Sequence, residues 1–476
     1  MLSLAVSVIF SSPEFLYVFL PVVWLGFMLL RWAAQDSDVQ VLWLLGASFF
    51  FYARWDASDL VLLLAVIATN FAAARAGRRF RSLGFLSIVC AANVAVLAGY
   101  KYIPWFAGSA ANRAELVDVL PLGISFFIFQ AVAFQVDRYR GAAVTYPLHR
   151  FALFMSFFPQ LIAGPIVHGR LLLPQLQTLG QRAIPLSLGL CLLSIGLAKK
   201  VLLADTLAPG VDALFAQPVG SDAIHAAAAA IGYGTQLYCD FSGYADMAIG
   251  LGLLFGLRLP QNFRAPYRAT SITDFWRRWH LTLSHFFRDY VYIPLGGNRR
   301  GAARRGLNVM GTMLLCGLWH GAGWQFVIWG GLHGGLLVLE GLWRKVRPIW
   351  ICKPVWLCRL YCLTLVMILW IPFRAPTVET AAILYSGLTD LKAPSWPTFW
   401  DLVQPVAQLS TQDSPAIVVL LLSALILGIL NLRPTAWRWC LRAGPMQRGA
   451  VTAILFLMVS KAMTARPEQP FLYFQF

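Results

Sequence analysis

Apolar residues dominate the chain in runs of near-bilayer length, separated by short polar stretches. A helix that crosses a membrane needs about 20 mostly apolar residues, so each such run is a candidate span. The candidates before the first long polar interruption are 15–31, 39–54, 58–74, 84–103, 121–136, 151–167, 186–204, 224–238 and 241–257. Those after it are 307–319, 323–342, 355–373, 416–432 and 449–463. Some are too short or too interrupted by Pro and Gly to be simple spans, so we expect roughly ten to thirteen crossings.

The composition supports a membrane protein. Of the 476 residues, 59% are hydrophobic and 12% are charged, whereas about 25% of residues are charged in an ordinary soluble protein. This balance excludes a soluble globular enzyme. Because consecutive spans pack laterally, we predict one all-α domain over residues 1–476, a polytopic transmembrane helical bundle with short, broken and re-entrant helices. The N-terminal apolar run lacks a basic leader, so we expect the first span to be retained.

The formal net charge of +17 would suggest nucleic-acid binding in a soluble protein. Here the basic residues lie in short bursts between apolar runs, a pattern typical of cytoplasmic loops, so we expect no nucleic-acid partner. Any two cytoplasmic clusters must be separated by an even number of crossings, and the candidate spans largely satisfy this condition. The exception is the pair Arg170 and Arg182, which favours a re-entrant segment around Gly164-Pro165. The basic clusters are 75–81, 299–305, 344–347 and 433–448.

The least hydrophobic stretch is 258–306, in which basic residues alternate with aromatic ones. Such alternation at helical spacing predicts an amphipathic helix at the cytoplasmic interface. Four of the seven histidines lie in or just after this stretch, at positions 280, 285, 320 and 333. Clustered imidazoles in a membrane protein are candidates for proton transfer. Their spacing matches no common metal motif, so we expect no metal.

His320 ends the short apolar segment 307–319, whose 13 residues rise only about 20 Å as a helix. Since the hydrocarbon core is about 30 Å thick, a helix that enters from Arg305 ends inside the membrane. The following Gly321-Ala322-Gly323 allows the chain to turn back. An imidazole at that depth needs a polar partner or a hydrated cavity. Two interpretations remain open: a functional base, or a histidine that only hydrogen-bonds a broken helix end.

Three blocks of the chain resemble the membrane-bound O-acyltransferase superfamily, and within it the branch of bacterial alginate O-acetyltransferase membrane subunits. They are QLYCDFSGYADMAIGLGLLFG (236–256), LPQNFRAPYRATSITDFWRRWHLTLSHFFRDYVYIPLGGNRRG (259–301) and GLWHGAGWQFVIWGGLHG (317–334). PLGISFFIFQ (121–130), FFPQLIAGPIV (157–167) and PFLYFQF (470–476) add to the similarity. The resemblance covers most of the chain, with its motif-rich core at 236–342.

The resemblance implies the roles of particular residues. The histidine of LWHG, His320, is the expected catalytic residue, and the histidine of RRWH, His280, is the second. Trp279, Trp319, Ser284 and His333 are expected to line the substrate tunnel, although both tryptophans can equally be packing aromatics. General-base catalysis by a neutral imidazole typically accelerates a reaction 10²- to 10⁴-fold.

Charged groups near these blocks have two interpretations each. Arg277, Arg278, Arg299 and Arg300 are candidates for binding the phosphates of a coenzyme A donor, or they set the topology. Asp240 and Asp246 lie in an apolar stretch, where a carboxylate needs a partner. We list both among the tunnel-lining candidates, but favour structural pairing with the arginine-rich segment over catalysis.

The function implied by the resemblance is acyl transfer from a cytoplasmic thioester, acetyl-CoA, with no bound cofactor. The chain would act in the bacterial inner membrane in the O-acetylation of a secreted polysaccharide such as alginate or cellulose. The implied partners are a periplasmic SGNH-type acetyltransferase and a polysaccharide synthase or secretion complex, with membrane lipid around the spans. Two alternatives remain open: the same chemistry on teichoic acid or lipid, and a transporter whose histidines relay protons.

Overall fold

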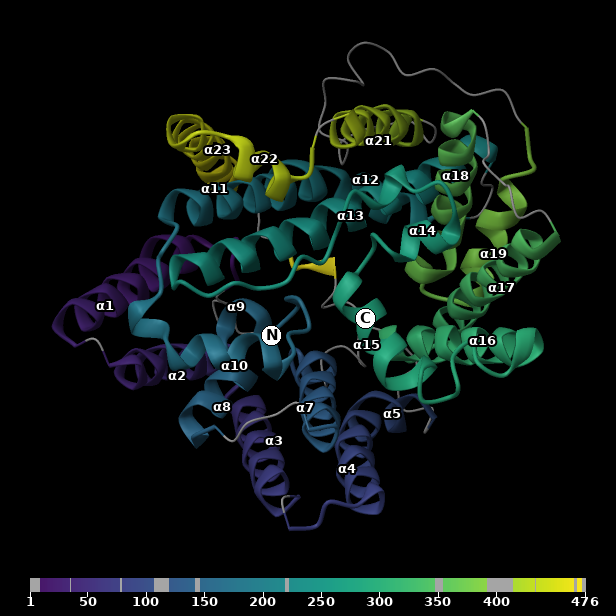
Figure 1. Cartoon of the computed structure of the whole chain (residues 1–476). Helices are drawn as coiled ribbons and strands as arrows, with labels where there is room; N and C mark the ends of the chain where they lie inside the picture. The colour runs from purple at the N-terminus through teal and green to yellow at the C-terminus, as the bar shows by residue number, and fades with distance from the viewer. Residues whose placement is uncertain are drawn as a thin grey trace. The chain divides into compact units, whose positions relative to one another are not determined.

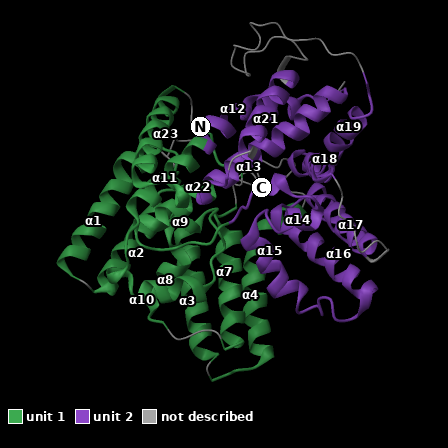
Figure 2. Cartoon of the chain, turned by 45° about the horizontal axis from the view of Figure 1, so that its top comes forward, with its two compact units in different colours: residues 1–198, 244–261, 439–475 green, residues 199–243, 262–438, 476 purple. Residues whose placement is uncertain are grey.

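The computed structural model describes residues 9–34, 36–77, 79–106, 120–141, 146–218, 222–346, 354–391, 414–432, 434–465 and 469–472. Over these ranges the chain is helical and contains no strand, which confirms the predicted all-α class (Figure 1). It divides into two compact units (Figure 2). Unit 1 comprises residues 1–198, 244–261 and 439–475, and unit 2 comprises 199–243, 262–438 and 476. That residues 1–476 act as one domain stays a prediction.

Unit 1 contains most of the N-terminal helices. They are η1 (Phe15–Phe19), α1 (Leu20–Ala33), α2 (Ser37–Ala53), α3 (Ala57–Ala76), α4 (Leu83–Lys101), α5 (Ile103–Phe106), α7 (Ile124–Tyr139), α8 (Leu148–Ser156), α9 (Phe158–Leu161), α10 (Gly169–Gln177), η2 (Leu179–Gln181) and α11 (Leu186–Leu197). Near the C-terminus, α23 (Pro445–Ala465) packs against α11 in the same unit. Phe15, Phe51 and Phe158 form part of an aromatic core in this unit.

Unit 2 contains the helices that carry the recognisable motifs. They are η3 (Ala198–Ala204), α12 (Asp205–Ala216), η4 (Pro266–Arg268), α14 (Ile272–Trp276), α15 (Leu281–Phe287), η5 (Arg288–Tyr292), α16 (Gly301–His320), α17 (Trp324–Val346), α18 (Val355–Arg374), α19 (Val378–Gly387) and α21 (Ser414–Leu432). Helices α13 (Ala223–Leu254) and α22 (Ala436–Arg442) each contribute residues to both units.

Seven helices of the described chain are long and apolar enough to cross a membrane, or eight if the bent pair α21 and α22 is one span. They are Phe15–Ala33, Ala57–Ala76, Leu83–Lys101, Leu186–Ala216, Trp324–Arg344, Val355–Arg374 and Pro445–Ala465. By length and composition, the number of candidate spans is smaller than the ten to thirteen crossings expected from the apolar runs. The chain is therefore a multi-pass membrane protein with fewer full-length spans than its apolar runs suggest.

Three of the expected spans were wrong in detail. Segments 224–238 and 241–257 form the single 32-residue helix α13, because no proline interrupts this stretch. Segment 151–167 is broken after Ser156, where α8 ends and the short α9 begins with Pro159 near its start. Of six spans expected between the basic clusters at 75–81 and 299–305, two merge and one is broken. Of the described helices in this stretch, Leu83–Lys101 and Leu186–Ala216 are long and apolar enough to cross a membrane.

The amphipathic helix expected over 258–306 was also wrong. The segment contains η4, α14, α15 continued directly by η5, and the start of α16 at Gly301, with non-helical residues elsewhere. Ala265 and His280 interrupt it with positive φ angles of 51° and 42°, which helices do not accommodate. Phe275, Trp279 and Phe286 are buried rather than placed on a membrane surface. The periodicity of the aromatic residues therefore reflects burial in unit 2.

Helices α16 and α17 form a hairpin held by small residues. A Cβ added to Gly317 would lie 2.2 Å from the carbonyl oxygen of Phe326, and one added to Gly330 would lie 2.3 Å from that of Met313. Both neighbours are backbone atoms, which cannot rotate away. Close approach of two backbones through glycine is typical of helix pairs in membranes.

We expect Gly317→Ala to destabilise the hairpin by roughly 1–3 kcal/mol, because the added methyl group forces the two helices apart. Gly311→Ala on the same helix is the matched control, since a Cβ there meets no atom within 4 Å. It should be neutral or stabilising by up to about 1 kcal/mol, because alanine favours helix more than glycine does. Thermal unfolding of both variants in detergent measures the difference, and equal midpoints would contradict the close contact.

Candidate active site

His320 lies at the end of α16, where the sequence predicts a break. The helix ends at this residue, Gly321 is extended, and α17 begins at Trp324. The predicted turn at 321–323 is therefore confirmed. The expected 13-residue helix is wrong, because α16 has 20 residues from Gly301 and rises about 30 Å, so its length does not by itself place His320 inside the membrane. His320 is 5% exposed. The carbonyl end of a helix carries partial negative charge, which favours a positive charge placed there.

Aromatic rings surround the His320 imidazole. The ring centroids of Trp319, Trp329 and Phe373 lie 4.9, 5.1 and 5.0 Å from that of His320, all in edge-on geometry. Trp329 comes from α17 and Phe373 from α18, so three helices of unit 2 converge on this side chain. This arrangement holds the imidazole in a largely apolar environment.

His333 lies on α17, one helical turn after Trp329, and its side chain is fully buried. The indole Nε1 of Trp276 donates a hydrogen bond of 3.3 Å to its Nδ1, so the neutral ring carries its proton on Nε2. Its ring centroid is 4.8 Å from that of Trp329, which also contacts His320. His333 therefore lies near the LWHG block, because Trp329 contacts both His333 and His320.

His280 occupies an unusual backbone position. Its φ is 42°, a left-handed conformation that is rare for a residue other than glycine and is often found at functional sites. Nδ1 lies 3.2 Å from Oδ1 of Asn262. Because the same oxygen also accepts a hydrogen bond from the backbone N–H of Thr282, Asn262 presents an acceptor and Nδ1 of His280 must donate.

This contact fixes the tautomer of His280. With the proton on Nδ1, the lone pair lies on Nε2, a buried atom without a hydrogen-bond partner in the described ranges. Burial lowers the pKa of His280 to about 3, so the ring stays neutral at physiological pH. Its centroid is 6.2 Å from that of Trp319, which in turn contacts His320. The two motif histidines are therefore bridged by one indole ring.

Asn262 is a residue that the sequence motifs did not single out. We expect Asn262→Ala to lower acyl transfer about tenfold or more, because the hydrogen bond that selects the His280 tautomer is lost. Thr282→Val is the matched control, since it removes the 3.0 Å bond from Oγ1 to Asn262 but leaves the histidine contact. Turnover at saturating donor measures the effect. Equal activity in wild type and Asn262→Ala would exclude this role.

Trp279 belongs to the aromatic cluster around the two motif histidines, which also contains Phe275, Trp319, Trp329, Trp370 and Phe373. Its ring lies 5.0 Å from Trp370 and 5.6 Å from Phe275, and Trp370 is 5.9 Å from Trp329. Ser284 is half-buried and donates to the carbonyl oxygen of Trp279 at 3.3 Å. The expected tunnel-lining residues Trp279, Trp319, Ser284 and His333 are therefore connected around the two motif histidines.

Asp240 has a partner that the sequence analysis missed. Its Oδ1 lies 2.8 Å from Nζ of Lys200, which also contacts Asp205 at 2.7 Å. Lys200 and Asp240 are each 1% exposed. The expected arginine partner from 258–306 is thus replaced by a lysine from the π-helix η3. Asp246, one of the other candidates, belongs to unit 1 and is half-buried.

The arginines proposed to bind the donor differ in their surroundings. Arg278 forms an ion pair with Asp274 at 2.9 Å. Arg277, Arg299 and Arg300 are exposed. Exposure is expected both of a residue that binds a soluble donor and of one that sets the topology. Of the basic clusters, Arg78, Arg347 and Arg433 lie outside the described residues.

One family model and several known proteins are similar to this chain. The family model of the membrane-bound O-acyltransferases matches residues 8–371. A peptidoglycan O-acetyltransferase of Helicobacter pylori is 38% identical over 81% of both chains. A probable alginate O-acetylase AlgI of Pseudomonas putida is 36% identical over 98% of this chain and 100% of its own. A teichoic acid D-alanyltransferase of Bacillus subtilis is 29% identical over 47% of this chain and 60% of its own.

The match includes the histidine-containing blocks and most of the residues of the aromatic cluster, and it extends through the motif-rich core at 236–342. Relatives that share more than a third of their residues over four-fifths of this chain or more are named as O-acetyltransferases or O-acetylases. The chain therefore belongs to the membrane-bound O-acyltransferase family, and it is a multi-pass membrane enzyme that transfers acyl groups to hydroxyls.

Proposed function

We propose that this enzyme takes an acetyl group from acetyl-CoA at the cytoplasmic face of the inner membrane and passes it outward for O-acetylation of an extracytoplasmic polysaccharide. In the reaction, a hydroxyl oxygen attacks the thioester carbonyl and the carbon–sulfur bond breaks. The hydroxyl proton passes to the imidazole and then to the departing thiolate. The products are an acetate ester and coenzyme A, so no oxidant or second donor is required.

The observation that carries this proposal is the position of His320 at the carbonyl end of α16, enclosed by Trp319, Trp329 and Phe373. Low exposure favours the neutral imidazole that a general base needs. The carbonyl end of the helix then favours the imidazolium that forms as the proton is taken. His280, on the other side of Trp319, is the second proposed catalytic residue.

The names of the relatives support a polysaccharide acceptor. Two of the relatives are named as enzymes of peptidoglycan or, with the word probable, of alginate, and both polymers are carbohydrates outside the cytoplasm. Alginate and cellulose remain the proposed polymers. A periplasmic SGNH-type acetyltransferase and a polysaccharide synthase or secretion complex are the proposed partners. Arg277, Arg299 and Arg300 are proposed to meet the phosphates of the donor.

The test uses purified full-length protein in lipid nanodiscs with acetyl-CoA labelled in the acetyl group. We expect release of free coenzyme A thiol and, with an acceptor polysaccharide and its periplasmic partner, label in an ester that hydroxylamine cleaves. A transporter with a histidine proton relay would instead move protons without releasing thiol. An enzyme for teichoic acid would ignore acetyl-CoA and consume a D-alanyl thioester, and a lipid acylase would place the label in the lipid fraction.

A further inference from the structure

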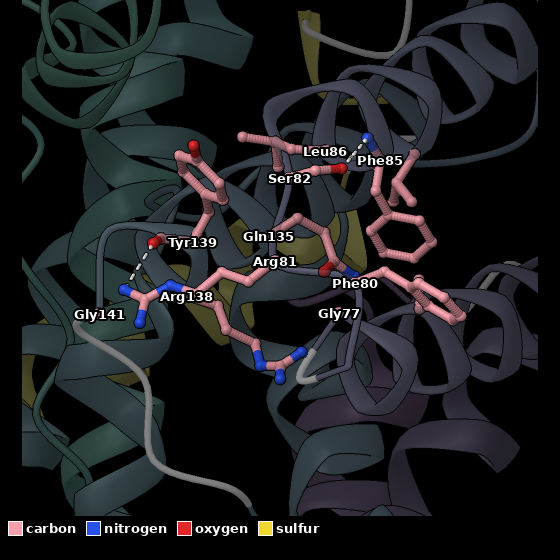
Figure 3. A pocket seen from close by; sticks show the side chains of 12 residues that line it. Gly77, Phe80, Arg81, Ser82, Phe85, Leu86, Gln135, Arg138, Tyr139 and Gly141 are labelled. Atoms are coloured by element: carbon pink, nitrogen blue, oxygen red, sulfur yellow. Dashed lines mark hydrogen bonds between the residues drawn. The ribbon is translucent and has the colours of Figure 1, made fainter.

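Unit 1 contains a pocket that the acyl-transfer chemistry does not use. It has a volume of about 370 Å³ and lies where α3 and α7 end and α4 begins (Figure 3). This volume is within the range of about 300–1,000 Å³ that is typical of small-ligand sites. The lining includes Arg81, Arg138, Phe80, Phe85, Leu86 and Val89.

The polar side of the pocket is cationic. Arg81 and Arg138 supply two guanidinium groups, and none of the described residues of the lining is acidic. Arg81 is held in place by a hydrogen bond of 3.4 Å from Nη2 to the carbonyl oxygen of Tyr139 (Figure 3). Both guanidinium groups lie beside the backbone at the helix ends, since a Cβ at Gly141 would lie 3.6 Å from Arg81 Nη2 and one at Gly77 would lie 3.5 Å from Arg138 Nη1. Two guanidinium groups in one pocket favour a phosphate ligand, because arginine forms bidentate, charge-assisted hydrogen bonds with phosphate oxygens.

The remaining wall is apolar and continues along a candidate membrane span. Phe85, Leu86 and Val89 lie on the first two turns of α4, which is 11% buried over its span. Phe80 is 56% exposed beside them. Both α3 and α4 are long and apolar enough to cross a membrane, so a pocket at their joined ends lies at a membrane interface. The basic residues around it place that interface on the cytoplasmic side.

We propose that this pocket binds the headgroup of an anionic phospholipid of the cytoplasmic leaflet. The phosphate lies between Arg81 and Arg138, and an acyl chain follows Phe85, Leu86 and Val89 along α4. A soluble phosphate compound such as coenzyme A shares the phosphate but has no acyl chain for the apolar wall. Surface arginines alone attract anionic lipid by general electrostatics, whereas a built pocket gives saturable binding of one lipid.

The experiment counts bound lipids on the purified full-length protein by native mass spectrometry in an uncharged detergent at fixed ionic strength. The probes are phosphatidylglycerol, phosphatidylcholine of equal chain length, and coenzyme A. We expect one tightly bound phosphatidylglycerol per chain, and an apparent Kd at least tenfold higher in the double variant Arg81→Gln/Arg138→Gln. The matched control Arg75→Gln/Arg79→Gln removes the same charge outside the lining and should change the Kd no more than about twofold.

Each other outcome overturns the proposal. If both double variants lose binding equally, the attraction is general surface charge. If phosphatidylcholine binds as tightly as phosphatidylglycerol, the headgroup charge is not recognised. If only coenzyme A binds and the Arg81 and Arg138 substitutions abolish it, the site serves a soluble phosphate. Should the double variant fail to fold, the single variants replace it, and each must raise the Kd about threefold or more.

Discussion

His320→Ala is expected to lower the release of coenzyme A from acetyl-CoA by a factor of about 10² to 10⁴, the usual contribution of a positioned general base. The variant removes the imidazole at the end of α16 while leaving the surrounding rings of Trp319, Trp329 and Phe373 in place. Binding of the donor should change much less, because the proton is transferred only as the ester forms. Turnover and donor affinity, measured separately, therefore distinguish lost chemistry from lost binding.

His225→Ala is the matched control for this prediction. His225 lies in the same unit, where its Nε2 meets the carbonyl oxygen of Leu214 at 2.9 Å, and it belongs to neither motif. Its substitution should leave turnover within about twofold of wild type. If His320→Ala and His225→Ala have the same turnover at equal expression, His320 is not the base.

The second large effect is on stability. Lys200→Met should destabilise the protein by about 3–5 kcal/mol, because it leaves the 1% exposed Asp240 as a buried charge without its lysine. Asp205, the other carboxylate beside Lys200, has a side chain that is 15% exposed and is more easily hydrated. Thermal unfolding in detergent, followed by tryptophan fluorescence, measures the loss.

Two further variants separate the ion pair from its surroundings. Lys199→Met removes the neighbouring positive charge, whose 3.3 Å contact is with the hydroxyl of Ser242, and should cost about 1 kcal/mol or less. The double variant Lys200→Met/Asp240→Leu removes both buried charges and should recover part of the stability lost in Lys200→Met alone. If the double variant is less stable by the sum of both single effects, Lys200 and Asp240 are not coupled.

The sequence predicted the long helices well where apolar runs have polar ends. Predicted spans 58–74 and 84–103 correspond to α3 and α4 within about two residues. It failed where packing within a unit overrides periodicity. The alternating basic and aromatic residues of 258–306 suggested a surface helix, but the aromatic side chains enter a buried cluster and the backbone turns at Ala265 and His280.

The candidate site was predictable only as far as its residues lie in recognisable blocks. His280, His320, Trp279 and Trp319 stand out within such blocks, whereas the residues that contact them through hydrogen bonds do not. Asn262 lies in the same block as His280, 18 residues before it, but no local pattern connects the two residues. Lys200 lies on a π-helix far from Asp240 in sequence. Local patterns carry no information on which distant side chain satisfies a buried polar group.

The most direct test of the central claim supplies labelled acetyl-CoA to one side of the membrane only. Oriented vesicles contain the enzyme with the basic clusters 75–81 and 299–305 toward the donor. The polysaccharide and its periplasmic partner are on the opposite side. The account predicts ester-linked label in the opposite compartment, equimolar free thiol on the donor side, and neither product with His320→Ala. Ester formed on the donor side, or transfer that persists in His320→Ala, would contradict it.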